Sequence, residues 1–346
     1  MAESDGLTYR EAGVDIEAGD EAVRRIGPLA RATLRPEVLG GIGAFASFVR
    51  VPAGYAEPVL VSSTDGVGSK LKVAFLADRH DTVGIDLVAM GVNDVLVHGA
   101  EPLYFLDYIG TSRLDPARVE RLVAGVAEGC RRAGCALVGG ETAELPDLYA
   151  AGEYDLAGFA VGIVERARII DGAAVKPGDV VLGLASSGLH SNGYSLARRI
   201  VFDVMGLGID APLPGTGRSV ADVLLEPTRI YVRAILPVRE DVTAMAHVTG
   251  GGLTGNLPRV LPEGCRALVR PAAWAERRPP VFGVLQEAGR VDEVEMFRTF
   301  NMGIGYVVVT RPTLADSVGA RLRAAGEEVV VIGEVVAGER GVELIR

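Results

Sequence analysis

Three acidic residues in the first half of the chain stand beside glycine or amide residues, each where an apolar segment ends. Asp65 lies in T-D-G, Asp94 in N-D, and Glu141 in G-G-E-T. Carboxylates at the ends of buried strands and helices can meet in three dimensions, and hard oxygen ligands of this kind suit Mg²⁺ bound to phosphate oxygens. The pattern predicts a magnesium and polyphosphate site. Taken singly, Asp94 and Glu141 also fit a solvated loop acid or a helix cap.

The densest group of polar residues is the segment from Ser62 to Leu71, S-S-T-D-G-V-G-S-K-L, which follows the apolar run 58–61. A buried strand that stops here would deliver an acid, hydroxyls and an ammonium to one turn. Lys70 lies a short turn from Asp65 and is expected to pair with a phosphate as a point charge. We therefore predict that this segment forms half of a phosphate site.

The second half carries polar loops rich in histidine and glycine. His190 opens H-S-N-G, and His247 opens H-V-T-G-G-G. An imidazole near its reference pKa can bind phosphate or shuttle a proton, and glycines let backbone N–H groups receive an anion. These loops predict a site for an anionic small molecule. A histidine hydrogen-bonded to its own loop is an equally good interpretation of His247.

Other nucleotide and catalytic signatures are excluded by the order of residues. The segment 66–71, G-V-G-S-K-L, lacks the Gly-Lys-Ser/Thr order and the upstream glycine of a Walker loop. Residues 250–255 match G-x-G-x-x-G, but no acid ends the next strand, where Arg270 and Pro271 stand, so we reject a dinucleotide site. The sequence has no Ser/His/Asp triad motif and no zinc-like spacing of Cys and His.

Strand and helix patterns indicate how these residues are positioned. Asp115 and Pro116 are a favoured cap and first residue of a helix. The turn signal V-K-P-G-D at 175–179 places a boundary near residue 170, which predicts two α/β domains at 1–170 and 171–346. The expected elements include helices at 81–98, 116–133 and 224–236 and strands at 58–61, 135–138 and 156–164.

Composition bounds the class of protein. The chain has 346 residues, enough for about two domains. Its 35 Lys and Arg against 45 Asp and Glu give a net charge of −10, which disfavours nucleic acid and anionic membranes as partners. Residues 1–6 are acidic and no apolar run reaches the length of a membrane span, so we expect neither secretion nor insertion. Cys130, Cys135 and Cys265 suit a reducing compartment, and the protein is expected to be cytoplasmic.

Eight motifs resemble the phosphoribosylformylglycinamidine cyclo-ligase family, also called aminoimidazole ribonucleotide synthetase. They run in order from Y-R-E-A-G-V-D-I at Tyr9 to F-N-M-G-I-G at Phe300, and they include D-L-V-A-M-G-V-N-D, G-G-E-T-A-E, H-S-N-G-Y-S-L and E-P-T-R-I-Y. Ser69 stands where the family often has Thr, and Ser63 stands where Gly is common. The resemblance covers nearly the whole chain.

The resemblance implies an ATP-dependent ring closure in purine biosynthesis. Formylglycinamidine ribonucleotide would be phosphorylated on its formyl oxygen and closed to aminoimidazole ribonucleotide, with ADP and phosphate as the other products. ATP and Mg²⁺ are the implied cofactors. The implied fold has an N-terminal α/β domain whose sheet pairs with its twin into a barrel across a homodimer, and a C-terminal ferredoxin-like α/β domain.

The resemblance also implies which residues form the site. Asp65, Asp94 and Glu141 would hold Mg²⁺. His190, Asp65 and Lys70 would be catalytic, with His190 orienting the reacting amide. The implied ATP contacts are Thr64, Gly66, Gly68, Ser69, Asn93, Gly139 and Gly140. The implied substrate contacts are Ser191, Asn192, His247, Gly250, Gly251, Gly252 and Asn301.

Related families with the same architecture fit less well. Selenophosphate synthetase would need an early glycine-flanked cysteine, the hydrogenase maturation dehydratase a C-terminal cysteine, and formylglycinamidine synthase a glutaminase domain, and the sequence shows none of these. Thiamine monophosphate kinase is a further alternative of this architecture. A catalytically silent nucleotide-binding regulator is the alternative from another class, and it predicts eroded acidic motifs, whereas all three are intact.

Overall fold

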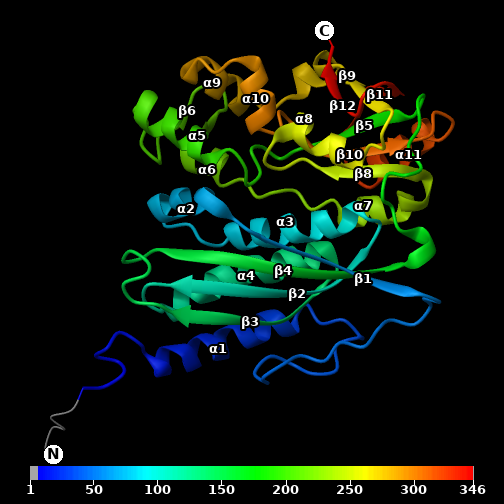
Figure 1. Ribbon diagram of the computed structural model, residues 1–346. Coiled ribbons are helices and arrows are strands. Elements are labelled where there is room, and N and C mark those ends of the chain that lie inside the picture. The colour runs from blue at the N-terminus through cyan, green and yellow to red at the C-terminus, as the bar shows by residue number, and fades with distance from the viewer. Residues whose placement is uncertain (1–6, 346) are drawn as a thin grey trace, which may run out of the picture.

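The chain folds around two main β-sheets with a layer of helices between them (Figure 1). The computed structural model describes residues 7–345. A four-stranded sheet has the order β1-β4-β2-β3, and a six-stranded sheet has the order β12-β9-β11-β5-β10-β8. One contiguous cluster of buried apolar side chains includes residues from both sheets and from the helices between them. The two sheets therefore share a core.

The N-terminal half contains the four-stranded sheet. Strand β4 pairs antiparallel with β1 and with β2, while β2 and β3 run parallel. In Figure 1, α2 and α3 lie between this sheet and the second one, and α1 lies beyond β3. The elements are α1 Ile16–Arg31, β1 Pro58–Gly66, α2 Leu71–Ala77, α3 Val83–Val97, β2 Glu101–Thr111, α4 Pro116–Ala133, β3 Ala136–Glu144 and β4 Tyr154–Glu165.

Helix α4 forms where its local signals predict. The Asp115 side chain accepts hydrogen bonds from the N–H groups of Ala117 and Arg118, and Gly134 ends the helix with φ 74°. Asp at the cap, Pro at the first position and Gly after the last turn each satisfy a separate requirement of helix termini. The predicted boundaries of this helix are confirmed.

Helix α3 is buried on nearly all sides because it lies between the two sheets. Its glycines permit close packing against α4 and the first sheet. A Cβ on Gly84 would lie 2.4 Å from the carbonyl oxygen of Leu122 in α4. Because that contact is shorter than any van der Waals separation, the two helices can approach this closely only with glycine at this position.

The C-terminal half contains the six-stranded sheet. Strands β9 and β12 are parallel and the other neighbouring pairs are antiparallel, so the four strands β11-β5-β10-β8 form an antiparallel group. A small hairpin of β6 Pro212–Leu213 and β7 Arg218–Ser219 stands apart. The remaining elements are β5 Val180–Ala185, α5 Tyr194–Arg198, α6 Val220–Leu224, α7 Val232–Ile235, β8 Val242–His247, α8 Gly252–Asn256, β9 Cys265–Val269, α9 Pro280–Gly289, α10 Glu293–Thr299, β10 Ile304–Thr310, α11 Ala315–Ala324, β11 Val329–Ala337 and β12 Gly341–Leu344.

The helix predicted at 224–236 is wrong in its first part. Helix α6 ends at Leu224 and α7 is a single turn, and the segment between them is not helical. Pro227 has no N–H for a helix, and the N–H of Thr228 donates instead to Asp86 in α3, at 2.7 Å. Contact with the other half of the chain overrides the local helical pattern.

Two further features bear on the sequence predictions. The predicted boundary near residue 170 falls in the connection between β4 and β5, which join different sheets. Among residues 7–345, every helix is too short or too polar to cross a bilayer.

Candidate active site

The two halves of the chain meet at a hydrogen bond between Asp94 and His247. Asp94 lies in α3, and His247 is the last residue of β8. Oδ1 of Asp94 is 2.8 Å from Nδ1 of His247, whose ring is almost fully buried, while 43% of the Asp94 side chain is exposed. A cleft of about 240 Å³ lies here, and its lining includes Ser62, Ser63 and Arg259. An acid, an imidazole, hydroxyls and a guanidinium therefore share one cleft.

Asp65 lies near this pair, at the end of β1. Burial raises the pKa of its carboxyl, the N–H of Gly66 opposes that rise through a 2.7 Å hydrogen bond, and the negative charge of Asp94 adds to it. A carboxylate whose ionisation is disfavoured by a second negative charge is stabilised by a cation placed between the two groups. Mg²⁺ commonly uses one or two carboxylates together with phosphate oxygens and water. Asp65 and Asp94 fit this requirement.

Glu141 does not join the other two acids. Gly66, Ala157, Tyr108 and Glu141 are aligned across the sheet on four successive strands, β1, β4, β2 and β3. Three strand spacings of about 4.8 Å put the backbone of Glu141 roughly 14 Å from that of Gly66, beside Asp65. Within residues 7–345, no three His, Cys, Asp or Glu side chains are grouped as a metal site. The arrangement of the described residues therefore does not support the prediction that Glu141 shares one metal ion with Asp65 and Asp94.

The predicted phosphate contact of Lys70 is also corrected. Its side chain is fully buried, and its ammonium lies 2.8 Å from Oδ2 of Asp86. The same ammonium donates to the carbonyl oxygens of His190 and Glu226, at 3.0 and 2.7 Å. Burial lowers the pKa of Lys70, and the charge of Asp86 opposes this. With its donors occupied, Lys70 joins the two halves and is not free to bind a phosphate.

Two asparagines predicted to contact ligands are part of the buried framework instead. Asn93 donates to the carbonyl oxygen of Arg229 at 2.8 Å and accepts from the N–H of Tyr231 at 3.1 Å. Asn301 donates to the carbonyl oxygen of Gly188 at 2.9 Å, and its own carbonyl oxygen accepts from neighbouring groups. Their amides are occupied, so neither prediction of a ligand contact is supported.

His190 is buried and lines neither the interdomain cleft nor the larger cavity described below. Its backbone has φ 60°, and its Nε2 accepts from the N–H of Ser187 at 3.2 Å. Burial lowers the pKa of the ring well below its ordinary value, with repulsion from His247 and Lys70 adding to the effect. The ring is therefore neutral, and His190 holds the loop around Ser187.

Three of the remaining predicted residues, Ser69, Ser191 and Thr64, carry hydroxyl groups. Ser69 and Ser195 bring their hydroxyls within 3.3 Å across the two halves, and Ser191 contacts Thr228 at 3.1 Å. Thr64 is exposed on the face of β1 opposite to Asp65.

Three of the predicted glycines are required by the backbone. Gly68, Gly251 and Gly252 have positive φ, and a Cβ on Gly252 would lie 1.9 Å from the carbonyl oxygen of Phe297. A Cβ on Gly250 would lie 3.4 Å from Oδ1 of Asn192, so this position does not require glycine.

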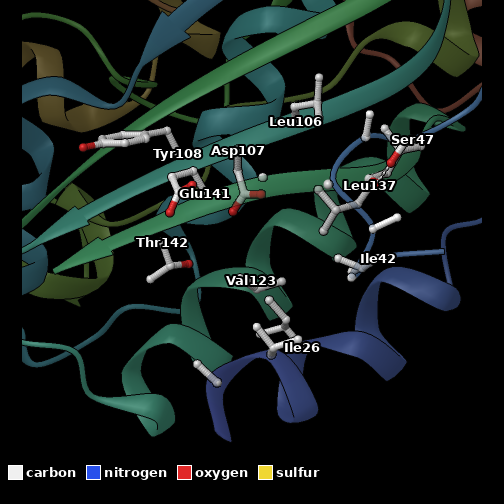
Figure 2. Close-up of a pocket in the computed structure, with 18 of the residues that line it drawn as sticks. Ile26, Ile42, Ser47, Leu106, Asp107, Tyr108, Val123, Leu137, Glu141 and Thr142 are labelled. Atoms are coloured by element: carbon white, nitrogen blue, oxygen red, sulfur yellow. Dashed lines mark hydrogen bonds between the residues drawn. The ribbon is translucent and has the colours of Figure 1, made fainter. Parts of the chain in front are cut away.

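A larger cavity, of about 560 Å³, lies beside the edge strand β3 (Figure 2). Gly139, Gly140 and Glu141 line it, as do Ile26 of α1 and Val123 of α4. Sequence reasoning missed the polar group at its centre, which is Asp107 of β2. The available signal was an acid inside the apolar strand L-Y-F-L-D-Y-I.

Comparison with known proteins identifies the family. The family profile described as AIR synthase related protein, N-terminal domain, matches residues 46–164, and the C-terminal domain profile matches residues 176–345. The phosphoribosylformylglycinamidine cyclo-ligase of Citrifermentans bemidjiense is 56% identical, over 98% of each chain. That of Anaeromyxobacter dehalogenans is 58% identical, over 97% of each chain. The chain belongs to the AIR synthase family.

Solved structures show that the AIR synthase fold extends to distant proteins. The thiamine-monophosphate kinase of Stenotrophomonas maltophilia has a TM-score of 0.67 and 21% identity, covering 94% of this chain and 95% of that one. The hydrogenase maturation protein HypE in complex with ATP has a TM-score of 0.60 and 20% identity, covering 92% of each chain. At such identities the likeness concerns the fold alone. The family resemblance read from the eight motifs is confirmed.

Proposed function

We propose that this AIR synthase family member catalyses the ATP-dependent cyclisation of formylglycinamidine ribonucleotide. The γ-phosphoryl group passes from ATP to the formyl oxygen, which releases ADP and a proton. The amidine nitrogen that bears the ribosyl group then attacks the formyl carbon, the C–O bond breaks, and phosphate and a second proton leave. The proposal is supported by 56% identity to a named cyclo-ligase over nearly the full length.

The observation that carries the proposal at the site is the meeting of Asp94 and His247 across the two halves. Phosphoryl transfer requires ATP and an acceptor to be held in one geometry, because alignment removes most of the entropic barrier. The cleft is lined by Ser62, Ser63 and Asp94 of the first half and by Arg259 of the second. Arg259 is suited to the phosphate of the ribonucleotide because its guanidinium is a planar donor.

Asp65 and Asp94 are the residues that would hold Mg²⁺ on the ATP phosphates. When bound, Mg²⁺ neutralises phosphate charge and orients the transferred group. His247 fixes the Asp94 carboxylate through Oδ1, which leaves the other oxygen for the ion. His190 acts as a positioning residue: its ring holds Ser187, and its carbonyl oxygen binds Lys70.

The proposed function is tested by measuring ADP and an aminoimidazole product with and without formylglycinamidine ribonucleotide. We expect ADP to form only with the substrate present, in a one-to-one ratio with the imidazole. Asp65→Asn should lower turnover by at least about tenfold and raise the Mg²⁺ requirement, which matches the loss of one charged ligand at 1.4 kcal/mol or more. Asp203→Asn is the matched control because Asp203 is exposed. ATP turnover that ignores the substrate would refute the proposal.

We further propose that the protein is a homodimer joined through the open face of the four-stranded sheet. Leu60 of β1 and Phe159 of β4 are 58% and 43% exposed, and strand alternation directs both side chains away from the helices. Closing this face against a second copy would form the barrel that the family resemblance implies. Burying an exposed apolar sheet face is also the usual way to remove an aggregation hazard.

Light scattering tests the homodimer. Phe159→Asp should convert the particle to a monomer of about half the mass, since a buried unpaired charge opposes association. Val331→Asp is the control because Val331 is 51% exposed in a strand of the other sheet. A dimer that is indifferent to Phe159→Asp but is lost with Val331→Asp would place the interface on the other sheet.

Three finer assignments complete the proposal. The antiparallel order β11-β5-β10-β8, with α11 between β10 and β11, supports a ferredoxin-like C-terminal domain. The acidic net charge of −10 supports a small-molecule partner rather than nucleic acid. The three buried free cysteines, Cys130, Cys135 and Cys265, support a cytoplasmic location.

A further inference from the structure

Another cavity, of about 580 Å³, lies where helix α7 meets the C-terminal end of α4. Three arginines from the two halves of the chain line it: Arg132 of α4, Arg229 before α7, and Arg233 within α7. Among the described residues, this cavity shares no lining residue with the cleft at Asp94 or with the cavity beside β3. It is therefore a separate candidate site, which the proposed reaction does not use.

The two acidic residues that line this cavity each have a cation of their own. Oε2 of Glu226 lies 2.7 Å from Nη2 of Arg218. Oε2 of Glu327, whose side chain is buried, lies 2.9 Å from Nε of Arg229. Because both carboxylates are paired, they offset the charge of Arg218 and Arg229 and leave that of the other arginines uncompensated.

Arg132 and Arg233 supply an excess of positive charge. A single carboxylate, that of Glu128, pairs with both Arg131 and Arg132. Nη2 of Arg233 donates to the backbone carbonyl oxygen of Arg131 at the end of α4, and not to a carboxylate. The lining residues and their direct partners thus bring together five guanidinium groups and three carboxylates, in a chain whose net charge is −10. Such a local reversal of sign attracts anions.

Each arginine that lines the cavity is held along one edge, which leaves other N–H groups for a ligand. A guanidinium has five N–H donors. Arg132 uses Nε, Arg229 uses Nε and Nη2, and Arg233 uses Nη2. Within residues 7–345, Nη1 of all three makes no hydrogen bond. A planar guanidinium that is anchored at one edge and free at the other suits the oxygens of a phosphate.

The cavity also has an apolar wall. Pro227, Ile230, Ala234 and Ala325 contribute to its lining. Its volume falls within the range of about 300–1,000 Å³ that is usual for small-molecule sites, and it is much larger than an inorganic phosphate. A ligand that fills the cavity therefore has an organic part for the apolar wall as well as an anionic group for the arginines.

We propose that this cavity is a second small-molecule site of the protein, which binds a phosphomonoester with its phosphate on Arg132 and Arg233 and its organic part against the apolar wall. At neutral pH a phosphomonoester carries about −1.5 to −2 charges, which matches the excess of guanidinium groups. A monocarboxylate would match only one of them. The site is additional to the cleft in which the ribonucleotide is proposed to react.

A ligand in this cavity would join the two halves of the chain. In Figure 1, α7 lies next to the layer of helices that separates the two sheets. Arg132 belongs to the first half and Arg233 to the second, and the backbone carbonyl oxygen of Arg229 accepts a hydrogen bond from Asn93 of α3 at 2.8 Å. Because the unfolded chain has no such cavity, the ligand should raise the temperature of unfolding as its concentration increases.

Calorimetric titration of the full chain with ribose 5-phosphate tests the site. We expect ribose 5-phosphate to bind and ribose, which lacks the phosphate, not to bind. Orthophosphate should bind more weakly than ribose 5-phosphate, because it leaves the apolar wall in contact with water. Equal binding of orthophosphate would assign the cavity to free phosphate, and absence of ribose 5-phosphate binding would remove the site; either result refutes the inference.

Four variants locate the bound ligand. Arg132→Met and Arg233→Met, both at exposed positions, should each weaken ribose 5-phosphate binding by about tenfold or more, which is the loss of one charge-assisted contact. Arg24→Met is the matched control, because the Arg24 side chain is 68% exposed on α1, and it should bind like the wild type. Arg259→Met, in the cleft, should also keep this binding. Binding that survives both cavity substitutions would overturn the inference, and its loss in Arg259→Met would then place the ligand in the cleft.

Discussion

Replacing Lys70 with methionine tests whether this lysine joins the two halves of the chain or binds a phosphate. Methionine keeps the unbranched stem and removes the ammonium. In the structure the ammonium contacts Asp86 and the carbonyl oxygens of His190 and Glu226, which come from the other half. The substitution therefore removes contacts to both halves at once. We expect a large loss of stability.

The magnitude follows from what the substitution leaves behind. Breaking a fully buried ion pair by removing one partner costs about 3–5 kcal/mol, because the Asp86 carboxylate stays buried without a counter-charge. Two carbonyl oxygens also lose a donor, at about 1 kcal/mol each. The expected decrease in the free energy of unfolding is therefore about 5–7 kcal/mol. That is a large fraction of the stability of an ordinary domain.

The double variant Lys70→Met/Asp86→Asn isolates the charge term. Asparagine keeps an oxygen for Thr228, whose N–H and hydroxyl both donate to Oδ1 of Asp86. With both charges removed, we expect the double variant to be more stable than Lys70→Met by about 2 kcal/mol in urea unfolding. Lys72→Met is the control, because the Lys72 side chain is 45% exposed and its ion pair with Glu153 lies at the surface.

The opposite result would restore the phosphate contact. If Lys70→Met unfolds like the wild type and instead raises the KM for ATP by orders of magnitude, the ammonium must reach the nucleotide in the working enzyme. The buried pair with Asp86 would then not be the state that matters for catalysis.

Three other substitutions give independent tests. His247→Gln should raise the Mg²⁺ concentration needed for half-maximal turnover by about 10-fold, because second ligand shells are worth 10- to 100-fold in metal affinity; unchanged Mg²⁺ activation would remove His247 from the site. Gly84→Ala should destabilise the protein by several kcal/mol in thermal unfolding because its Cβ would overlap α4, whereas Gly19→Ala, in open space on α1, should be neutral or stabilising. Asp107→Asn should gain stability relative to the wild type between pH 5 and pH 8 in urea unfolding. The pKa of Asp107 in the folded protein, about 7, lies above the ordinary 3.8, so the free energy of unfolding of the wild type falls as the pH rises between these two values, by at most about 1.4 kcal/mol per pH unit. The same pH dependence of unfolding in the wild type and in Asp107→Asn would contradict this.

Local sequence signals correctly predicted helix α4, whose terminal backbone groups are capped by residues next to it in the sequence. Helix α4 illustrates this, because Asp115, Pro116 and Gly134 each act within one turn of the helix terminus. The same reasoning failed at 224–236, where the apolar spacing suits a helix but Thr228 is drawn to Asp86, 142 residues away in the sequence. A contact over such a separation leaves no periodic pattern in the sequence.

The sequence also indicated only some features of the candidate site. Asp65 and Asp94 were predicted as site residues because each stands beside glycine or amide residues where an apolar segment ends. Glu141 has the same sequence signature, but the order of strands in the sheet places it three strands away from Asp65. A short motif does not reveal the order of strands in a sheet. Lys70 was assigned from its nearness to Asp65 in sequence, whereas its contacts depend on which half folds over it.

Helix α3 carries both Asp94 and the buried side chains that attach this helix to the C-terminal half. Asp86, Asn93 and Asp94 are seven and eight residues apart, so they lie on one face of the helix. Each bonds to the C-terminal half: Asp86 to Thr228, Asn93 to the backbone of residues 229 and 231, and Asp94 to His247. The motif D-L-V-A-M-G-V-N-D begins and ends with these residues. Asp94 is thus held at the cleft by two buried contacts on its own helix, which preorganises the carboxylate that we propose as a metal ligand.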